Sequence, residues 1–335
     1  MQDLVSVIIP NRNGADTIGI CLAAAQASQH ANFEIIVVDD HSDDHSVEVI
    51  ERYPCKLVRL RQHGGAARAR NAGARHSRGR ILFFTDADCL LQPDTLALAA
   101  ATLAREGAHA IVGGTYMRAP YDRRFFSRFQ SIFINHFESR RAPAADYIAT
   151  HALAIDASVF RANGGFAEDV RPILEDVEFS HRLRRAGCRL VMNPAIQVQH
   201  IFHFSLLRSL RNAFIKSLYW TAYAIANRDL LADSGTASAA LKLNVLVFAA
   251  NLGLLAGFLV TGNGMLLALL ALALAFNLFA NRGLLLAYHR AEGPGFALKA
   301  ALYYLLLYPL AVGAGAGAGM LRHVSSRPLR PGEHR

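Results

Sequence analysis

The sequence predicts an α/β domain with a mainly parallel sheet, followed by helices that cross a membrane. Short β-branched runs alternate with helix-favouring segments through about the first 105 residues, which is typical of a parallel sheet covered by helices on both faces. Hydrophobic residues make up 53% of the 335 residues and charged residues 18%, and the apolar excess lies in the C-terminal part. No charged residue lies between Leu243 and Asn281, which predicts membrane-spanning helices.

Four strands and four helices are predicted in alternation before residue 106. The strands are 5–9, 34–38, 56–60 and 81–84, and the helices are 15–28, 47–52, 66–76 and 93–105. We expect the first strand to end at Pro10, because proline has no N–H to donate to the ladder. Farther along the chain, Glu175 begins a predicted helix that closes at Gly187, and "IQVQH" at 196–200 has the composition of a strand.

Polar side chains follow three of the predicted strands. Asn11, Arg12 and Asn13 come after the first strand, Asp39 and Asp40 after the second, and Asp86 and Asp88 after the fourth. In such sheets the ligand lies beyond the carboxyl ends of the strands, so we expect these side chains to gather at one edge. Asp86 and Asp88 supply the oxygen ligands that Mg²⁺ and Mn²⁺ prefer. The alternative is that the pair caps the helix beginning near Pro93.

The C-terminal part contains enough uncharged sequence for three membrane crossings. The 39 residues from Leu243 to Asn281 fit two helices joined by the turn "TGNG" at 261–264, since one crossing takes about 20 residues. The predicted spans are about 243–260, 264–281 and 300–321, and Pro309 is expected to kink the third. Glycine and alanine alternate at 313–319, which predicts close helix packing. A buried helical core is the alternative, although core helices are seldom apolar all round.

The predicted organisation has four segments. These are a cytoplasmic domain at 1–200, amphipathic linker helices at 201–238, transmembrane helices at 239–322 and a basic tail at 323–335. The N-terminus has no basic region followed by a long apolar stretch, so we expect the first domain to stay in the cytoplasm. An amphipathic helix in the segment 201–238 fits either of two positions, in the membrane interface or packed against the cytoplasmic domain. Three crossings would put the basic tail outside, against the positive-inside tendency, unless one segment is re-entrant or interfacial.

Charge and cysteine content narrow the function classes. The formal net charge is +9 and the sequence pI is about 9.7, yet no aromatic-basic recognition motif accompanies the scattered Lys and Arg residues. Attraction to anionic lipid and to a phosphorylated substrate explains the excess of positive charge without a nucleic-acid partner. The four cysteines are widely spaced and form no paired motif, which predicts free thiols in a reducing compartment.

An ordered set of short motifs resembles glycosyltransferase family 2 over about the first 200 residues. The motifs are "VSVIIPNRNG", "IIVVDDHSDD", "GGAARARNAG", "FFTDADC", "GGF" and "LEDVEFSHRLRRAG". Each is short, but their order and spacing together are specific. The family often has glycine where His41 stands in this sequence, which leaves the conformation of that loop open.

The resemblance implies the GT-A fold, a nucleotide-diphosphate sugar as donor and inversion at the anomeric carbon. It implies a divalent cation, Mg²⁺ or Mn²⁺, held at the DXD element formed by Asp86 and Asp88, with His200 as a further candidate ligand. It implies that Asp176, the second residue of "ED", is the general base. The residues expected to bind the donor are Pro10, Asn13, Asp40, Arg70, Asp86 and Glu175, with Asp40 at the base and Arg70 near the base and phosphates.

The physical requirements of the reaction agree with these roles. Inversion needs the acceptor hydroxyl to attack opposite the leaving diphosphate, so one carboxylate must take its proton while a cation stabilises the departing charge. Asp176 is remote in sequence from the metal pair and therefore suits the base. Its alternative role is capping the helix that begins at "ED". The alternative role of His200 is that of a structural histidine.

The predicted function is a membrane-bound glycosyltransferase, of the hexosyl-transferring type, in the bacterial cell envelope. We expect a UDP-sugar as donor, a lipid or polyprenyl-linked acceptor, and a multi-pass protein of the inner membrane with its catalytic domain in the cytoplasm. Processive polysaccharide synthases of the family carry Gln-x-x-Arg-Trp after the catalytic core, whereas this chain has only "SLYW", so we expect a single sugar transfer. The alternatives are an inactive scaffold or partner subunit, and a nucleotidyltransferase.

Overall fold

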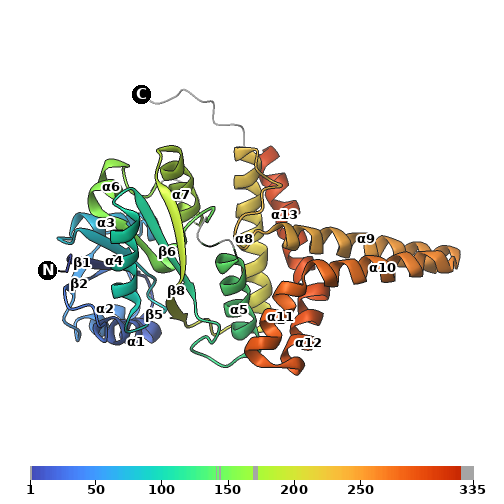
Figure 1. Cartoon of the computed structure of the whole chain (residues 1–335), viewed down its shortest axis with the longest axis horizontal. Helices are drawn as coiled ribbons and strands as arrows, with labels where there is room; N and C mark the ends of the chain where they lie inside the picture. The colour runs from blue at the N-terminus through green and yellow to red at the C-terminus, as the bar shows by residue number, and fades with distance from the viewer. Residues whose placement is uncertain (1, 141, 143–144, 169–172, 326–335) are drawn as a thin grey trace. The chain divides into compact units, whose positions relative to one another are not determined.

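The computed structural model describes residues 2–140, 142, 145–168 and 173–325. The chain divides into two compact units, of which the first ends at His203 and the second begins at Phe204 (Figure 1). The first unit contains the sheet and the second contains helices. The two units are described separately.

The first unit is built on an eight-stranded sheet with the order β3-β2-β1-β4-β7-β6-β8-β5. The strands are β1 (Val5–Asn11), β2 (Phe33–Asp39), β3 (Lys56–Arg59), β4 (Ile81–Phe84), β5 (Cys89–Leu91), β6 (Ala110–Tyr116), β7 (Leu153–Asp156) and β8 (Arg189–His200). The pairs β1–β2, β2–β3 and β1–β4 are parallel, as predicted. Beyond them the sheet is mixed, because β7 is antiparallel to both β4 and β6.

Seven helices accompany the sheet in the described residues of this unit. They are α1 (Ala15–Gln26), α2 (Ser46–Ile50), α3 (Gly65–Arg75), α4 (Thr95–Glu106), α5 (Phe125–Ser139), α6 (Ala157–Ala162) and α7 (Glu175–Arg185), with a short 3-10 turn η1 (Thr150–Ala152). Gly73 lets α3 lie close to the sheet, since a Cβ atom there would come within 2.5 Å of Ile8 on β1. Phe84 on β4 packs against Phe160 and Phe166 in the apolar core on this side. The core thereby fixes the strand that leads to the two aspartates.

Two local predictions for the sheet were incomplete. The first strand does not end at Pro10, because β1 continues to Asn11. Pairing with β4 stops at Ile8, so Pro10 has β2 alone as a neighbour and its missing N–H removes no bond to β4. The sequence analysis also missed β5, a three-residue strand that pairs antiparallel with β8.

The second unit consists of helices. These are α8 (Leu206–Asn227), α9 (Ala239–Thr261), α10 (Gly264–Ala280), α11 (Arg282–Glu292), α12 (Pro294–Leu302), a π-helical turn η2 (Tyr303–Leu307) and α13 (Tyr308–Ser325). By length and composition, α9 and the continuous stretch Pro294–Ser325 could each cross a membrane. The pair α10 and α11 would make a third crossing if it acts as one span, although it bends by 62°.

Helices α8 and α13 pack closely through small residues. A Cβ atom on Gly315 would come within 2.3 Å of the Phe214 carbonyl oxygen, and one on Gly319 within 2.5 Å of that of Leu218. The Ser217 hydroxyl donates to the Val312 carbonyl oxygen at 2.8 Å. The close packing predicted from the alternating glycine and alanine residues is therefore confirmed.

A buried polar network joins α9, α10 and η2. Asn277 Nδ2 donates to Asn244 Oδ1 at 2.7 Å, and Asn281 Nδ2 donates to Asn277 Oδ1 at 2.8 Å. The Tyr304 hydroxyl donates to Asn281 Oδ1 at 3.0 Å. All four residues are at most 2% exposed, so the network excludes solvent.

The network also supplies a hydrogen-bond donor to a backbone carbonyl at the point where Pro309 interrupts the last helix. The Tyr308 N–H donates to the Tyr303 carbonyl in the π-helical turn, and Pro309 has no N–H to donate. The Tyr304 carbonyl instead accepts from Asn244 Nδ2 at 2.7 Å. An unpaired backbone carbonyl is costly in an apolar environment, so Asn244 stabilises this irregular turn.

We expect Asn244→Leu to lower the free energy of unfolding by about 1–3 kcal/mol, because it leaves the Tyr304 carbonyl and the Asn277 amide unpaired. The measurement is thermal or denaturant unfolding of the full chain in detergent. Asn251→Leu is the matched control on the same helix, since Asn251 Oδ1 has no hydrogen-bond partner in the described part of the chain. Equal losses in the two variants would contradict the assigned role.

Candidate functional site

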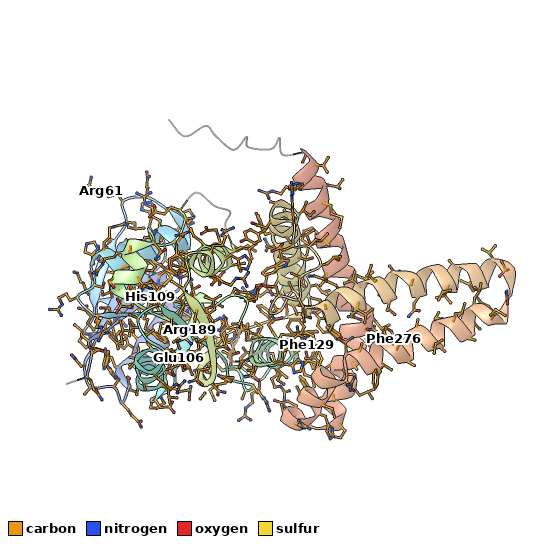
Figure 2. All side chains as sticks on the ribbon, turned by 45° about the horizontal axis from the view of Figure 1, so that its top comes forward. Arg61, Glu106, His109, Phe129, Arg189 and Phe276 are labelled. Carbon is orange, nitrogen blue, oxygen red and sulfur yellow. The ribbon has the colours of Figure 1, made fainter. Side chains whose placement is uncertain are left out.

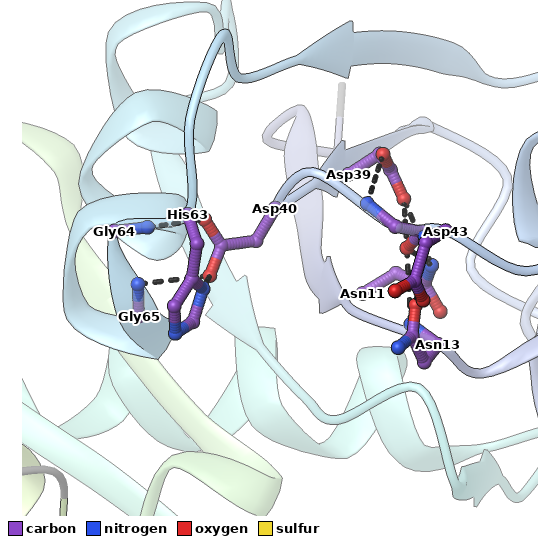
Figure 3. A network of polar contacts seen from close by, with 9 residues as sticks. Asn11, Asn13, Asp39, Asp40, Asp43, His63, Gly64 and Gly65 are labelled. Atoms are coloured by element: carbon purple, nitrogen blue, oxygen red, sulfur yellow. Dashed lines mark hydrogen bonds and ion pairs between the residues drawn. The ribbon is translucent and has the colours of Figure 1, made fainter.

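Polar groups at the carboxyl ends of β1 and β2 form one connected network (Figure 3). Asn11 Nδ2 donates to Asp39 Oδ1 at 3.2 Å, and the Ser42 hydroxyl donates to the same oxygen at 2.5 Å. Asn13 has a left-handed backbone with φ of 52°, and its Oδ1 accepts from the Asp43 N–H at 3.0 Å. The predicted donor-binding residue Asn13 thus holds the loop that follows β2 in place, while Pro10 lies on β1, one residue before the end of that strand.

His41 adopts the left-handed conformation that glycine favours. Its φ is 61°, a region that costs a non-glycine residue roughly 1–2 kcal/mol. The position at which this chain departs from the family pattern therefore retains a glycine-like backbone. The loop keeps its shape because Ser42 and Asp43 are bonded to the strand ends on either side.

Asp40 orders the start of α3. Its carboxylate accepts from the Gly64 N–H at 2.7 Å and the Gly65 N–H at 2.8 Å, and it lies 2.8 Å from His63 Nδ1 (Figure 3). A carboxylate at a helix N-terminus is stabilised by the exposed N–H groups and the helix dipole. Asp40 thereby places the glycine turn beside the predicted nucleotide site.

Arg70 on α3 connects the end of β4 to the start of α7. Its Nη2 donates to Asp86 Oδ1 at 2.6 Å, and its Nη1 donates to Glu175 Oε1 at 2.5 Å. The side chain is 5% exposed, so both ion pairs are shielded from water. Burial alone would lower the pKa of Arg70, but the two carboxylates outweigh it and raise the pKa. Arg70 therefore connects the end of β4, 16 residues away along the chain, with the start of α7, 105 residues away, as a fixed cation.

The two aspartates of the DXD element have different environments. Burial alone would raise the pKa of Asp86, but the charge and hydrogen bond of Arg70 dominate and lower it. Burial raises the pKa of Asp88 and Asp86 raises it further, while His200 opposes the shift. The Asp88 side chain is 40% exposed, whereas the Asp86 side chain is 30% exposed. Asp86 is thus directed toward Arg70, and Asp88 is the better placed to meet a cation.

Strand pairing brings a ligand set together around Asp88. Cys89 on β5 pairs with His200 on β8, and His200 Nε2 lies 3.5 Å from Asp88 Oδ1. The ligand atoms of Asp88, Cys89 and His200 all lie within 4.8 Å of one another. Burial raises the pKa of the Cys89 thiol well above its usual value, so the thiol stays protonated. The Asp88 carboxylate fits Mg²⁺ or Mn²⁺, the His200 imidazole fits a transition-metal ion better than Mg²⁺, and the protonated thiol is not a metal ligand.

Asp176 lies in the first turn of α7, next to Glu175. The preceding residue, Leu174, has φ of 89°, a strained backbone that redirects the chain into the helix. Asp176 Oδ1 accepts from the Val177 N–H at 2.8 Å, and Oδ2 accepts from the Thr150 N–H at 3.4 Å. Burial and the charge of Glu175 raise its pKa to about 6, although Arg70 opposes them. A carboxylate with this pKa can act as a base near neutral pH.

A buried pair that was not predicted from the sequence, His151 and Glu138, lies beside these residues. His151 Nε2 lies 3.5 Å from Glu138 Oε2, and both side chains are at most 6% exposed. Burial alone would lower the pKa of His151, but Glu138, Asp86 and Asp176 outweigh it and raise the pKa. The His151 carbonyl accepts from the Thr85 hydroxyl at 2.9 Å, which ties η1 to the end of β4. Glu138 belongs to a segment with an ordinary amphipathic helix pattern, so no sequence signal marked it.

Comparisons with known proteins agree with this geometry. Residues 6–163 match the family model for glycosyl transferase family 2. Glycosyltransferase GlyG of Streptococcus pneumoniae serotype 4 (strain ATCC BAA-334 / TIGR4) is 27% identical over 131 residues, which cover 38% of this chain and 44% of that protein. The putative teichuronic acid biosynthesis glycosyltransferase TuaG of Bacillus subtilis (strain 168) is 34% identical over 100 residues, which cover 28% of this chain and 40% of that protein. The matches thus span less than half the length of these relatives.

A solved structure shares the fold. The mannosyltransferase PcManGT from Pyrobaculum calidifontis, determined in complex with GDP-Man and Mn²⁺, superposes with a TM-score of 0.59 and 20% sequence identity. The likeness covers 98% of this chain and 88% of that chain. The GT-A fold predicted from the sequence is therefore confirmed.

We expect Arg70→Met to lower the free energy of unfolding by about 3–5 kcal/mol, because it leaves Asp86 and Glu175 as unpaired buried charges. Denaturant unfolding of the full chain, followed by circular dichroism, measures the loss. Arg78→Met is the matched control, since Arg78 pairs with Glu34 at 2.9 Å but its side chain is 78% exposed. That variant should change stability by less than about 1 kcal/mol, and a similar effect in both would refute the special role of Arg70.

We expect Asp176→Asn to unfold at a higher temperature than the wild type at pH 8. The folded-state pKa of about 6 exceeds the ordinary 3.8, so the folded state binds more protons between about pH 4 and pH 6 and loses stability as pH rises through that window. Asparagine has no charge to desolvate and avoids this loss. The melting curves of Asp176→Asn and the wild type should coincide at pH 4.5 and differ at pH 8. The exposed variant Asp94→Asn should follow the wild type at both pH values. Superposed curves at pH 8 would show that burial does not penalise the ionised carboxylate.

Proposed function

The N-terminal unit belongs to glycosyl transferase family 2, and we propose that this glycosyltransferase is metal-dependent and inverting, and transfers a single sugar. The observation that carries the proposal is the separation of two carboxylate groups by Arg70. Asp86 and Asp88 lie at the end of β4, where Arg70 Nη2 binds Asp86, and Asp176 follows Glu175, which binds Arg70 Nη1; the pKa of Asp176 is raised to about 6. Asp86 and Asp88 suit the binding of a cation and a diphosphate, and Asp176 suits proton transfer.

The donor is a nucleotide-diphosphate sugar at the carboxyl ends of β1, β2 and β4. Pro10, Asn13 and Asp40 line the nucleotide end, where Asp40 holds the glycine turn at the start of α3. Asp88 and His200 would hold Mg²⁺ or Mn²⁺, with the oxygen of Asp86 that Arg70 leaves free as a third ligand. When bound, the cation neutralises charge on the departing diphosphate. The complex of the similar mannosyltransferase with GDP-Man and Mn²⁺ supports this donor class and cofactor.

Asp176 is the proposed general base. Its carboxylate takes the proton of the acceptor hydroxyl as the hydroxyl oxygen bonds to the anomeric carbon and the bond to the diphosphate breaks. Glu175 is paired with Arg70 at 2.5 Å, so its charge is compensated and it positions the helix rather than competing for the proton. A backbone amide on each oxygen of Asp176 fixes the direction of the carboxylate.

We propose a lipid or polyprenyl-linked acceptor at the cytoplasmic face of the inner membrane. The second unit supplies helices long and apolar enough to cross a bilayer, which supports an acceptor that is itself held in the membrane. A UDP-hexose is the first donor to test. Single transfer is proposed because the chain has "SLYW" in place of the motif of processive synthases.

The decisive experiment measures nucleoside diphosphate release from a panel of nucleotide sugars by the full chain in native lipid extract. We expect release that needs Mn²⁺ or Mg²⁺, that chelator abolishes, and that Asp176→Asn lowers by about 10²–10⁴-fold. Asp94→Asn, an exposed change outside the site, should keep wild-type activity. Pyrophosphate release would identify a nucleotidyltransferase instead, and no release from any donor by a folded chain would identify an inactive partner subunit.

The pH dependence provides a separate test of Asp176. Since the base must be ionised, kcat/KM should fall about tenfold for each pH unit below about pH 6 and level off above it. The measurement is initial rate against pH at constant ionic strength and saturating metal. A profile that stays flat down to pH 4.5 would contradict the assignment of Asp176 as base.

A further inference from the structure

The second unit holds two sets of apolar helices in crosswise directions. Helices α9 and α10 form a hairpin that runs crosswise to α8 and α13 in both views (Figures 1 and 2). The buried network of Asn244, Asn277, Asn281 and Tyr304 fixes the base of this hairpin to η2. Because a bilayer has one normal, the hairpin and the α8–α13 pair cannot both cross it end to end.

The hairpin has the properties of the crossing element. From Leu243 to Asn281 it carries no charged residue, and it contains no tyrosine or tryptophan. Only 11% of the most apolar 18-residue stretch of α9 is buried, and the exposed large apolar side chains of the hairpin include Leu259 and Phe276, of which Figure 2 labels Phe276. At 1.5 Å per residue, α9 is about 34 Å long and α10 about 26 Å, close to the roughly 30 Å hydrocarbon core.

Charges adjoin the hairpin only at its base. Lys242 immediately precedes the uncharged stretch, and Arg282 immediately follows it. Both ends of the hairpin therefore carry basic residues on one side of the bilayer, as the positive-inside tendency requires of the cytoplasmic side. The turn at 261–264 reaches the opposite side.

The α8–α13 pair has the properties of an interfacial element. Lys216 lies beside Phe214 and Ser217, the residues that contact Gly315 and Val312 near the centre of the apolar stretch of α13. Lys216 is exposed, and so is Arg211, five residues earlier on the same helix. If α13 crossed the bilayer, α8 would carry these cations into hydrocarbon at about 2.5–3.5 kcal/mol each.

Aromatic residues support the same division. Six of the ten tyrosines and the single tryptophan lie in the second unit, and all of them are outside the hairpin. They are Tyr219, Trp220, Tyr223, Tyr288, Tyr303, Tyr304 and Tyr308. Tyr223, Tyr288, Tyr303, Tyr304 and Tyr308 are buried inside the unit, so of these seven residues Tyr219 and Trp220 on α8 are the ones that can meet the lipid headgroups, where tyrosine and tryptophan are enriched.

We infer that the chain crosses the bilayer twice, through α9 and α10, and that α8 and the Pro294–Ser325 stretch lie in the headgroup interface. The inference rests on the proposed membrane attachment. It places the end of α13, at Ser325, on the cytoplasmic side of the bilayer, where Lys242 and Arg282 also lie. The conflict between three crossings and the positive-inside tendency then disappears.

Cysteine labelling tests the inference in spheroplasts that express the full chain. Thr261→Cys places a thiol at the hairpin turn and Ser325→Cys places one at the end of α13, both at exposed positions. A membrane-impermeant maleimide should label Thr261→Cys in intact spheroplasts and Ser325→Cys only after lysis. The wild type is the background control, because its four cysteines all lie in the first unit. A GFP fused after Arg335 should fluoresce, and alkaline phosphatase fused there should be inactive.

The other outcomes overturn the inference in distinguishable ways. External labelling of Ser325→Cys, with an active phosphatase fusion, would establish a third crossing. Protection of both cysteines in a chain that resists carbonate extraction would show that the hairpin does not cross. Release of the chain by carbonate would show that the protein is not embedded in the membrane, which contradicts the attachment on which the inference rests. The nucleoside diphosphate release assay tests the transferase activity separately.

Discussion

The buried guanidinium of Arg70 is the interaction on which the candidate site depends. It binds Asp86 at the end of β4 and Glu175 at the start of α7, so one cation sets the distance between the two acidic groups. The same pairing keeps Asp86 ionised and compensates Glu175, while Asp176 retains a raised pKa. Arg70 thus affects the environments of Asp86, Glu175 and Asp176, which neither a surface ion pair nor a more mobile lysine would achieve.

The second unit obeys a different constraint, the need to pair every backbone polar group that water does not reach. Pro309 removes one N–H, the helix responds with a π-helical turn, and Asn244 supplies the missing donor to Tyr304. The residues that repair the helix also fix the hairpin to it. Polar side chains in an otherwise apolar sequence therefore determine how its helices are arranged.

Much of the site could be anticipated because its chemistry follows regular strand ends. Buried β-branched runs locate β1, β2 and β4, and the polar residues after them must meet at one edge of a parallel sheet. The partners of these residues could not be anticipated. Arg70 was expected near the nucleotide, but no sequence pattern indicated its pairing with two carboxylates, and Glu138 lies on a helix whose pattern resembles any amphipathic helix.

The sequence by itself determined the α/β class, the family resemblance, the acidic motifs and the presence of long apolar helices, because these depend on local periodicity and residue type. Only the tertiary structure decided that Cys89 pairs with His200, that Thr150 donates to Asp176, and that α9 and α10 run crosswise to α13. These features depend on contacts between segments far apart in the chain. Their geometry is set by packing and by the pairing of buried polar groups, which no local pattern records.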